Sequence, residues 1–509
     1  MLIVSAASRR GLSRLVCRLL VCLGGIPPAV VADEAPLTLE DTLTRVLEAN
    51  LRLRVARGDH AVAEQRRAAE WSIFEPQLLF SAAREANSRR NTTEQFLRQS
   101  VSTFDEDNEV YSAAIESILP TGGTLRLGSQ MRGLRNNLQV GQREWDSFTG
   151  LTLTQPLLRG AGWGAVAAEI RLATADSEIA LQELRGQMAL VLSESEFAFW
   201  EARAAAELIS LREASLRLAQ DMLQDNRERV QAGRMVELEV LQAEAGVALR
   251  RSGLSEARKR QVDALSRLKA FLARDARQPA SLALAGELAG TAPVTESAEG
   301  LLAGIHDHPA YRAQRERLEQ AGIRVAYAKN QRWPQLDLKA SYGLNGLGGD
   351  FDQSYDRAFH EDYDSWYVGV EINVPVFGGK RTRHELSAAR IRQRQAIDRL
   401  AAIEIELSNG VHALVAGVES LRDRVEALES VVAVQENVLR AENDRLLAGQ
   451  SESRRLLEVE EDLSNARVEA LQAQLELRQA TAQLLVQQGT YLQARGFELA
   501  EARGGKGRR

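Results

Sequence analysis

The chain has 509 residues, of which 44% are hydrophobic and 26% are charged, and its formal net charge is −6. That length allows two or three ordinary domains or one large elongated body. No window resembles a membrane-spanning helix, because no run of about 18 to 20 uncharged apolar residues occurs. The acidic balance also argues against nucleic acid as a partner. Composition cannot exclude the strands of a membrane barrel, because each strand gives only a weak signal.

The first 32 residues have the features of a secretory signal peptide. Arginines precede an apolar stretch that ends at Val31, and a small residue follows at a suitable cleavage site. Removal of residues 1–32 takes the formal charge from −6 to −10, because the segment holds four arginines and no acid. Cys17 and Cys22 both lie inside it, so the mature chain would contain no cysteine, which suits an oxidising compartment without a disulfide framework. A lipid on Cys22 is an alternative, although the bulky Val21 precedes that cysteine.

The chain repeats itself. Each half reads as helix, Pro-Gln boundary, strands, proline boundary, very long helix, glycine turn and returning helix. The paired landmarks are Ala49–Leu51 with Asp307–Pro309, Pro76–Gln77 with Pro334–Gln335, Gly150–Pro156 with Gly369–Pro375, and Arg229–Gly233 with Arg445–Gly449. We predict a first structural repeat over 33–290, a second over 291–493 and a disordered tail over 494–509.

A seven-residue spacing predicts the long helices. Leucines from Leu400 to Leu428 stand seven apart, a second stripe runs from Val411 to Leu446, and the first half carries one from Met188 to Val230. Such a repeat keeps one seam against a neighbouring helix and winds left-handed. The predicted segments are long helices over about 163–231 and 380–447, and return helices over about 235–273 and 451–492. The first long helix would span about 100 Å at 1.5 Å per residue.

Two segments, about 77–155 and 335–374, carry the two-residue period of strands. Leu336 and Leu338 alternate with Asp337 and Lys339, so that one face is apolar and the other polar. Strands between lipid and a wet lumen have this pattern, although a soluble sheet on a core has it too. Tryptophans at the strand ends fit two interfacial belts. They are Trp71, Trp163 and Trp333 at the inner ends, and Trp145 and Trp366 at the outer ends.

A sheet crosses lipid only if it closes on itself. Two strands from each half are too few for a pore, so we expect three copies to supply twelve. The first half has about 39 extra residues between its prolines, with strand character at 110–118 and 124–130. Glu116 shares a face with Ala114 and Ile118, and a lipid-facing glutamate is unfavourable. We therefore expect this hairpin to be an appendage; the alternative is six strands per chain and eighteen in a trimer.

The order, duplication and spacing of these motifs resemble the TolC family of outer-membrane efflux proteins, from about Leu37 to Leu492. The motifs that carry the resemblance are the boundaries at Pro76, Pro156, Pro334 and Pro375 and the turns near Gly233 and Gly449. The resemblance implies a mixed α and β fold with an internal two-fold repeat. Three copies would build a transmembrane β-barrel in the outer membrane and a periplasmic α-barrel of long antiparallel coiled-coil helices.

The same resemblance implies a channel subunit of a tripartite efflux or type I secretion system, which conducts its substrates passively. Its partners would be two further copies of the chain, outer-membrane lipid, a periplasmic adaptor (membrane fusion) protein and an inner-membrane transporter. The cargo, whether drugs, metals or proteins, stays open. The alternative from another class is a periplasmic structural or adhesive coiled-coil protein without a pore.

The resemblance also implies charged side chains at the periplasmic entrance. Two acidic positions of the family fall on Arg455 and Glu458, so one acid is kept and one charge is reversed, while Glu239 keeps an acid in the first-half turn. The tyrosine and arginine that help latch the entrance in the best-known member are both replaced here. We expect closure to pair Arg454 or Arg455 with Glu239 or Glu458; unpaired charges at a solvated helix end are the other interpretation.

The remaining functional expectations concern docking and chemistry. The turns at Gly233–Arg234 and Gly449–Gln450 would lie at the far end of the rods, where we expect the adaptor to dock. No motif points to catalysis, a metal or a cofactor. The segment His306–His308 invites a metal interpretation, but it stands at a helix break whose counterpart is Ala49–Leu51.

Overall fold

The computed structural model describes residues 36–137, 143–274, 283–288, 300, 304–360, 363–374, 379–448 and 450–497. The predicted signal peptide, Pro375, Gly449 and the tail from residue 498 lie outside the described residues. None of the described helices combines the length and the hydrophobicity that a bilayer crossing requires.

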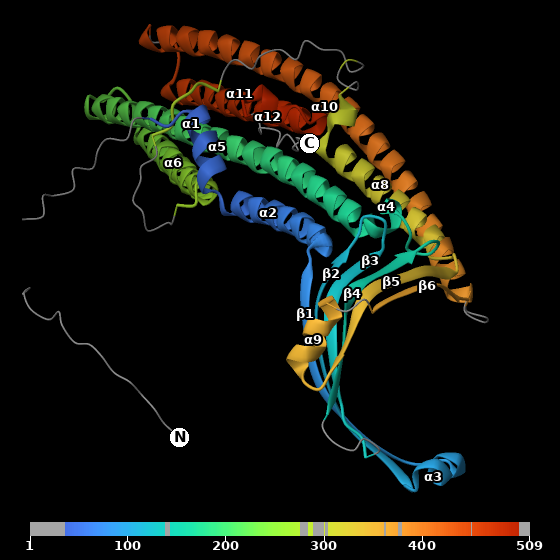
Figure 1. Cartoon of the computed structure of the whole chain (residues 1–509). Coiled ribbons are helices and arrows are strands. Elements are labelled where there is room, and N and C mark those ends of the chain that lie inside the picture. Colours follow the sequence, from blue (N-terminus) through green and yellow to red (C-terminus); the bar gives the residue numbers. More distant parts are fainter. Residues whose placement is uncertain are drawn as a thin grey trace, which may run out of the picture.

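Long helices fill one end of the molecule and a sheet fills the other (Figure 1). The helices of the first repeat are α1 (Leu39–Ala49), α2 (Leu51–Trp71), α3 (Thr93–Gln99), α4 (Trp163–Val166), α5 (Ala168–Gln231) and α6 (Glu237–Phe271). Those of the second repeat are α8 (Pro309–Asn330), α9 (Phe351–His360), α10 (Gly379–Leu447), α11 (Ser453–Gln488) and α12 (Tyr491–Ala494). Short 3-10 turns, η1 (Ser72–Phe74) and η2 (Ile305–Asp307), precede β1 and α8.

Two antiparallel helix pairs, α5 with α6 and α10 with α11, form the rods. Val411, Val418 and Val425 of α10 are buried against Leu477 and Leu484 of α11, which is the predicted seven-residue seam. The first seam begins with Met188 and Ser195, both buried. One interruption was not predicted: Ala167 leaves helical geometry, so that a short α4 precedes the long α5.

The landmarks at the start of each repeat are helix caps. The Asn50 side chain accepts hydrogen bonds from the backbone N–H groups of Arg52 and Leu53, and so caps α2. At the equivalent position, His308 Nδ1 accepts from the Ala310 N–H at 3.1 Å, and Pro309 occupies the first turn of α8. A side-chain acceptor here satisfies an N–H group that the first helical turn leaves unpaired. The cap accounts for His308 without a metal.

The sheet contains six strands among the described residues, in the sequential order β1-β2-β3-β4-β5-β6, and every neighbouring pair is antiparallel. The strands are β1 (Gln77–Arg90), β2 (Thr103–Ile118), β3 (Thr124–Leu134), β4 (Glu144–Pro156), β5 (Gln335–Gly348) and β6 (Asp364–Asn373). The expectation that the extra hairpin is an appendage was therefore wrong. Its two stretches are β2 and β3, in the middle of the sheet. The physical reason is that Glu116 lies on the polar face, opposite Arg126, and not on the face that carries Ile115.

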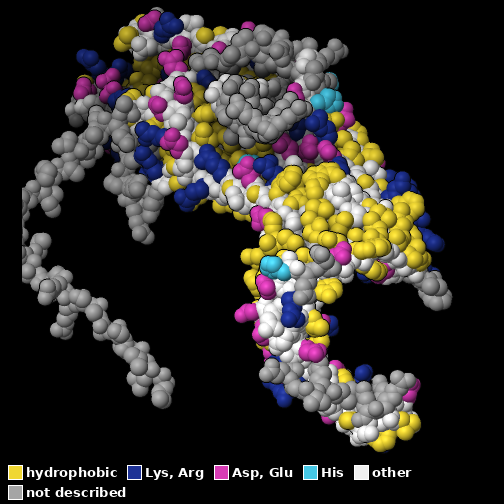
Figure 2. Space-filling model, in the orientation of Figure 1, with side chains coloured by type: hydrophobic (Ala, Val, Ile, Leu, Met, Phe, Trp, Pro, Cys, Tyr) yellow, Lys and Arg dark blue, Asp and Glu magenta, His cyan; other side chains and the backbone are white. Residues whose placement is uncertain are grey.

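The sheet has one apolar face and one polar face. The apolar face carries Phe80, Leu127 and Val368, which are all more than half exposed in the single chain. Figure 2 shows hydrophobic side chains gathered over the half of the sheet next to the helices, with charged and polar side chains toward the far end. An exposed apolar surface of this kind indicates a partner or a lipid environment.

The main hydrophobic core lies around the middle of α5, where α1, α2, α5, α6, α11 and α12 meet. Phe199 and Trp200 pack edge to face at its centre, with ring centroids 5.1 Å apart. The chain remains ordered beyond the predicted start of the tail at 494. Arg495 forms an ion pair with the buried Glu196 of α5, and Phe497 packs against this core.

Candidate entrance and docking turns

The far ends of the two rods are built in the same way. Gly233 adopts a left-handed conformation (φ 69°) after α5, and the N–H of Arg234 donates to the Arg229 carbonyl at 2.8 Å. In the second repeat the N–H of Gln450 donates to the Arg445 carbonyl at 2.9 Å. This six-residue hydrogen bond is the Schellman ending of a helix, for which glycine is the preferred residue because it lacks a Cβ. Gly449 itself lies outside the described residues. The turns expose Arg234 and Gln450.

The predicted entrance residues lie on the first two turns of the return helices α6 and α11. Both Arg454 and Arg455 contact Glu458, at 3.2 Å and 3.1 Å, within the single helix α11. Of the expected pairings, the structure therefore brings together those with Glu458 and does not bring either arginine to Glu239. Glu239, which is partly buried at the start of α6, accepts a hydrogen bond on its backbone carbonyl from Asn226 at 3.5 Å. Pairs within one helix do not tie the two rods together.

Other polar residues join the first rod to α11. The guanidinium of Arg250 on α6 meets the Glu460 carboxylate on α11 at 2.9 Å, and both side chains are only 9% exposed. Arg250 also donates to the Leu457 carbonyl at 3.1 Å and to the Ser215 hydroxyl at 3.2 Å. Closer to the tip, the buried Ser453 hydroxyl donates to the Asn226 side-chain oxygen at 2.9 Å. A charge-assisted, fully partnered pair of this kind positions two helices specifically.

Sequence reasoning missed these residues, although a signal was present. Arg250 stands seven residues after Ala243 and seven before Ala257, both of which are buried seam residues of α6. Glu460 likewise follows the buried Ser453 by seven. A charge in a seam position requires a partner, because an unpaired charge there is costly to bury.

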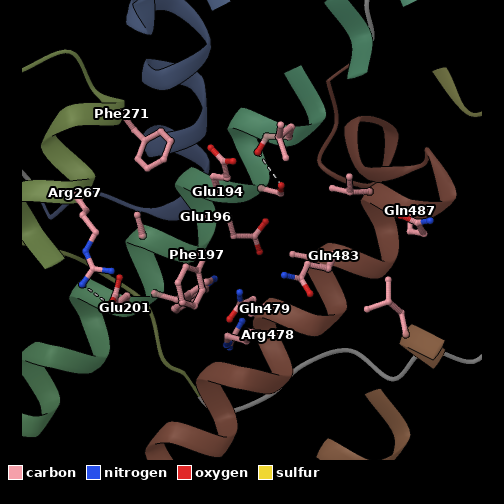
Figure 3. Close-up of a pocket in the computed structure, with 17 residues that line it drawn as sticks. Glu194, Glu196, Phe197, Glu201, Arg267, Phe271, Arg478, Gln479, Gln483 and Gln487 are labelled. Carbon is pink, nitrogen blue, oxygen red and sulfur yellow. Dashed lines mark hydrogen bonds and ion pairs between the residues drawn. The ribbon is translucent and has the colours of Figure 1, made fainter. Parts of the chain in front are cut away.

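A second polar cluster holds the junction between the repeats. The Arg478 guanidinium lies 3.9 Å from the Trp200 ring centroid and donates to the carbonyls of Leu288 and Glu287. Figure 3 shows Arg478 and Gln479 from α11 facing Glu196 and Phe197 from α5 across a pocket. The cluster fastens the segment between the repeats to the helices.

The buried Glu196 carboxylate completes this junction. It accepts a hydrogen bond from the Tyr491 hydroxyl at 2.7 Å and also pairs with Arg495. Burial, reinforced by the neighbouring Glu196, raises the pKa of Tyr491, so the phenol remains a neutral donor. The pocket therefore contains a structural network whose charged groups are already paired.

The predicted strand boundaries lie together at the inner edge of the sheet. Pro76 and Pro334 stand immediately before β1 and β5, and Pro156 is the last residue of β4, opposite Asp337. Proline has no N–H to give to a strand ladder, so it suits these end positions. The exit from β4 is held by the Gly160 N–H, which donates to Asn330 at the end of α8 at 2.8 Å. Pro375 lies outside the described residues.

No cluster of three or more metal-ligating side chains occurs among the residues that the structure describes. Asp307, the middle residue of the His306–His308 segment, pairs with Arg312 at 2.5 Å. The described contacts of Asp307 and His308 are therefore with the first turns of α8.

Comparison with known proteins gives the family. The model of the outer membrane efflux protein family matches residues 42–274 and 305–490. The chain belongs to this family. The efflux family is one of outer-membrane channels, so the chain is an export channel component of the outer membrane, and its family and fold are those of channels and not of enzymes.

Relatives of this family member include the alkaline protease secretion protein AprF of Pseudomonas aeruginosa, with 24% identity over 66% of the chain and 67% of AprF. The proteases secretion protein PrtF of Dickeya chrysanthemi is 25% identical over 70% of the chain and 76% of PrtF. Among solved structures, the Campylobacter jejuni CmeC outer membrane channel matches with a TM-score of 0.65 and 16% identity, covering 91% of this chain and 87% of CmeC. That likeness shows the same fold.

The Arg250–Glu460 pair generates a stability prediction. Glu460→Leu leaves the Arg250 charge buried without its carboxylate, which costs about 3–5 kcal/mol. The double variant Arg250→Met/Glu460→Leu removes both charges and should lose much less stability than the sum of the two single variants. Thermal unfolding of the purified protein measures this, and additive losses would contradict the coupling.

The matched control is the exposed pair of Arg258 on α6 with Glu213 on α5, whose atoms are 3.2 Å apart. Exposed pairs contribute little to stability. Glu213→Leu should therefore shift the midpoint temperature of thermal unfolding far less than Glu460→Leu does.

Proposed function

We propose that three copies of this chain form a continuous conduit through the outer membrane and the periplasm. Three observations support the proposal. The chain belongs to the outer membrane efflux protein family, its sheet has apolar side chains on one exposed face, and β1 and β6 each have one edge without a neighbour among the described residues. Open sheet edges do not occur in lipid, so further copies must pair with them.

We further propose that the conduit serves type I secretion of a polypeptide, together with a periplasmic adaptor and an inner-membrane transporter. The relatives AprF and PrtF, which are named for protease secretion, support this choice of cargo. The conduit itself is passive. Cargo crosses it without chemical change, and the transporter supplies the energy.

Deletion of the gene tests the proposal. In the bacterium that encodes the protein, deletion should remove at least one polypeptide from the culture medium and cause it to accumulate inside the cell. The restored wild-type protein should fractionate with outer membranes, run as a trimer by mass photometry in detergent, and co-purify with an inner-membrane transporter after cross-linking. An unchanged set of secreted proteins together with greater sensitivity to toxic compounds would instead assign drug efflux.

The docking turns generate a second functional prediction. A lysine at Gly233 would strain the turn as well as change the surface, because φ is 69° there. Arg234→Glu combined with Gln450→Glu changes only exposed side chains on the two turns. It should reduce export at least tenfold and leave the outer-membrane trimer intact, because the adaptor surface is altered and the fold is not.

Arg251→Glu is the matched control for the docking test. Arg251 is exposed on α6, about 20–25 Å along the helix from the Gly233 turn at 1.5 Å per residue. Its export should equal that of the wild type. Equal export by the turn variant would place docking elsewhere on the rods.

We also propose that Glu239, Arg454, Arg455 and Glu458 surround the entrance of the assembled trimer. Three copies would bring three of each side chain to one mouth, where contacts between copies can hold it closed. Arg455→Ala combined with Glu458→Ala should therefore raise single-channel conductance in planar bilayers. The Glu213→Leu variant, changed on α5 about 30 Å along the helix from the Gly233 turn at 1.5 Å per residue, is the control. A conductance equal to that of the control would remove these residues from the gate.

A further inference from the structure

The hairpin of β2 and β3 is a full part of the sheet. β1 pairs with β2 along its whole length, from Gln77 opposite Glu116 to Arg90 opposite Thr103. β3 pairs with β4 from Thr124 opposite Thr154 to Leu134 opposite Glu144. The hairpin therefore separates β1 from β4, and its removal would break two complete ladders of backbone hydrogen bonds.

The turn of this hairpin lies at the inner edge of the sheet, beside the helices. The Thr121 hydroxyl donates to the Gln155 side chain at 2.7 Å, and the Gly162 N–H donates to the Thr121 carbonyl at 2.9 Å. A Cβ on Gly122 would come within 2.5 Å of the Gly160 carbonyl oxygen, so the two turns touch closely. β2 thus ends and β3 begins at the same inner edge as the end of β4, β3 pairs with β4 out to Glu144, and β2 continues beyond it with β1. The hairpin therefore lies within the sheet and not over its outer end.

The division into an apolar and a polar face continues across all six described strands. One row of directly opposed residues, with one member per strand, is entirely apolar, and each member is 42–74% exposed: Leu78, Ile115, Leu127, Leu151, Tyr342 and Trp366. The row one residue along, on the other face, is Gln77, Glu116, Arg126, Thr152, Ser341 and Tyr367. Strands that cross a membrane require this strict division, with lipid on one side and water on the other.

The outer limit of the apolar face is the same on β2 as on β4. Tyr111 of β2 stacks against Trp145 of β4 with ring centroids 6.2 Å apart. Beyond Tyr111 on the same face, Asp107 is bonded to Arg84 of β1 by two contacts of 2.7 Å. Aromatic side chains followed by charges mark the boundary between hydrocarbon and water.

We propose that all six strands of each chain cross the outer membrane, so that the trimer closes an eighteen-stranded barrel in which β6 of one copy pairs with β1 of the next. This inference rests on the trimeric conduit proposed above. The exposed apolar row from Leu78 to Trp366, including its members on β2 and β3, contacts lipid, and Glu116 and Arg126 face the water-filled lumen. Barrel diameter grows roughly linearly with strand number, so the barrel is about one and a half times as wide as one of twelve strands.

Cysteine labelling in outer membranes tests the proposal, since both natural cysteines lie within residues 1–32. Ile115→Cys and Leu127→Cys should resist a charged aqueous maleimide and react with a lipid-soluble one. Glu116→Cys and Arg126→Cys, their neighbours on the polar face, should react with the aqueous reagent. Leu151→Cys and Val368→Cys on β4 and β6 are controls that face lipid whether or not the hairpin crosses. Each variant replaces one side chain by cysteine, and recovery of trimers establishes that the variant has folded.

The outcomes separate this proposal from the conduit. If Ile115→Cys and Leu127→Cys react with the aqueous reagent as fast as their polar-face neighbours while Leu151→Cys and Val368→Cys are protected, the hairpin does not cross and the barrel has twelve strands. If all four apolar-face positions react with the aqueous reagent, the sheet is not in lipid and the proposed conduit fails as well. Protection of all four, at least tenfold relative to the polar-face positions, supports six crossing strands.

Discussion

A backbone inside hydrocarbon has no water with which to pair its N–H and C=O groups, and every such group must find a partner in the protein. The sheet of this chain meets that requirement internally from β1 to β6, but the outer edges of β1 and β6 have no strand beside them among the described residues. The chain alone is therefore incomplete as a membrane structure. Under the proposed function, further copies of the chain close those edges, while the apolar face lies toward lipid and the polar face toward water.

The helical end obeys a different constraint. Its seams consist of apolar and small side chains, which hold helices together but do not specify which helices pair. Polar residues at seam positions supply that choice. Arg250 on α6 is fully partnered only when Glu460 and the Leu457 carbonyl of α11 lie opposite it. A shift of one rod past the other leaves a buried charge unpaired, which favours a few discrete arrangements over continuous sliding.

The regular elements were predictable because each obeys a local period. The stripe containing Val411, Val418 and Val425 is buried as its seven-residue spacing requires. The repeated landmarks were also informative, since Asn50 and His308 cap equivalent helices. Each of these signals is a local pattern of a few residues, found along the sequence or repeated in it, and needs no knowledge of the tertiary structure.

The remaining features depend on contacts between distant segments. Arg250 and Glu460 are 210 residues apart, and no period names the partner of a seam charge. The face of Glu116 was assigned from its own strand alone, where Ala114 and Ile118 made that side look apolar. Only the register shows Ile115 in line with Leu127 and Leu151, and Glu116 in line with Arg126. The division of a sheet into two faces is a property of neighbouring strands, which a single strand with small residues does not reveal.

Each repeat has an even number of described strands. This explains how the two repeats can differ in their strands and still have the same arrangement of long helices. The first repeat has four described strands and the second has two, yet both return the chain to the inner edge, where α5 and α10 begin. A hairpin starts and finishes on the same side of the sheet, so β2 and β3 leave the direction of every later element unchanged. One additional strand would have started α5 on the outer side. The scaffold can therefore gain strands in pairs, and a barrel can widen by this route while the number and direction of the helices in each copy stay the same.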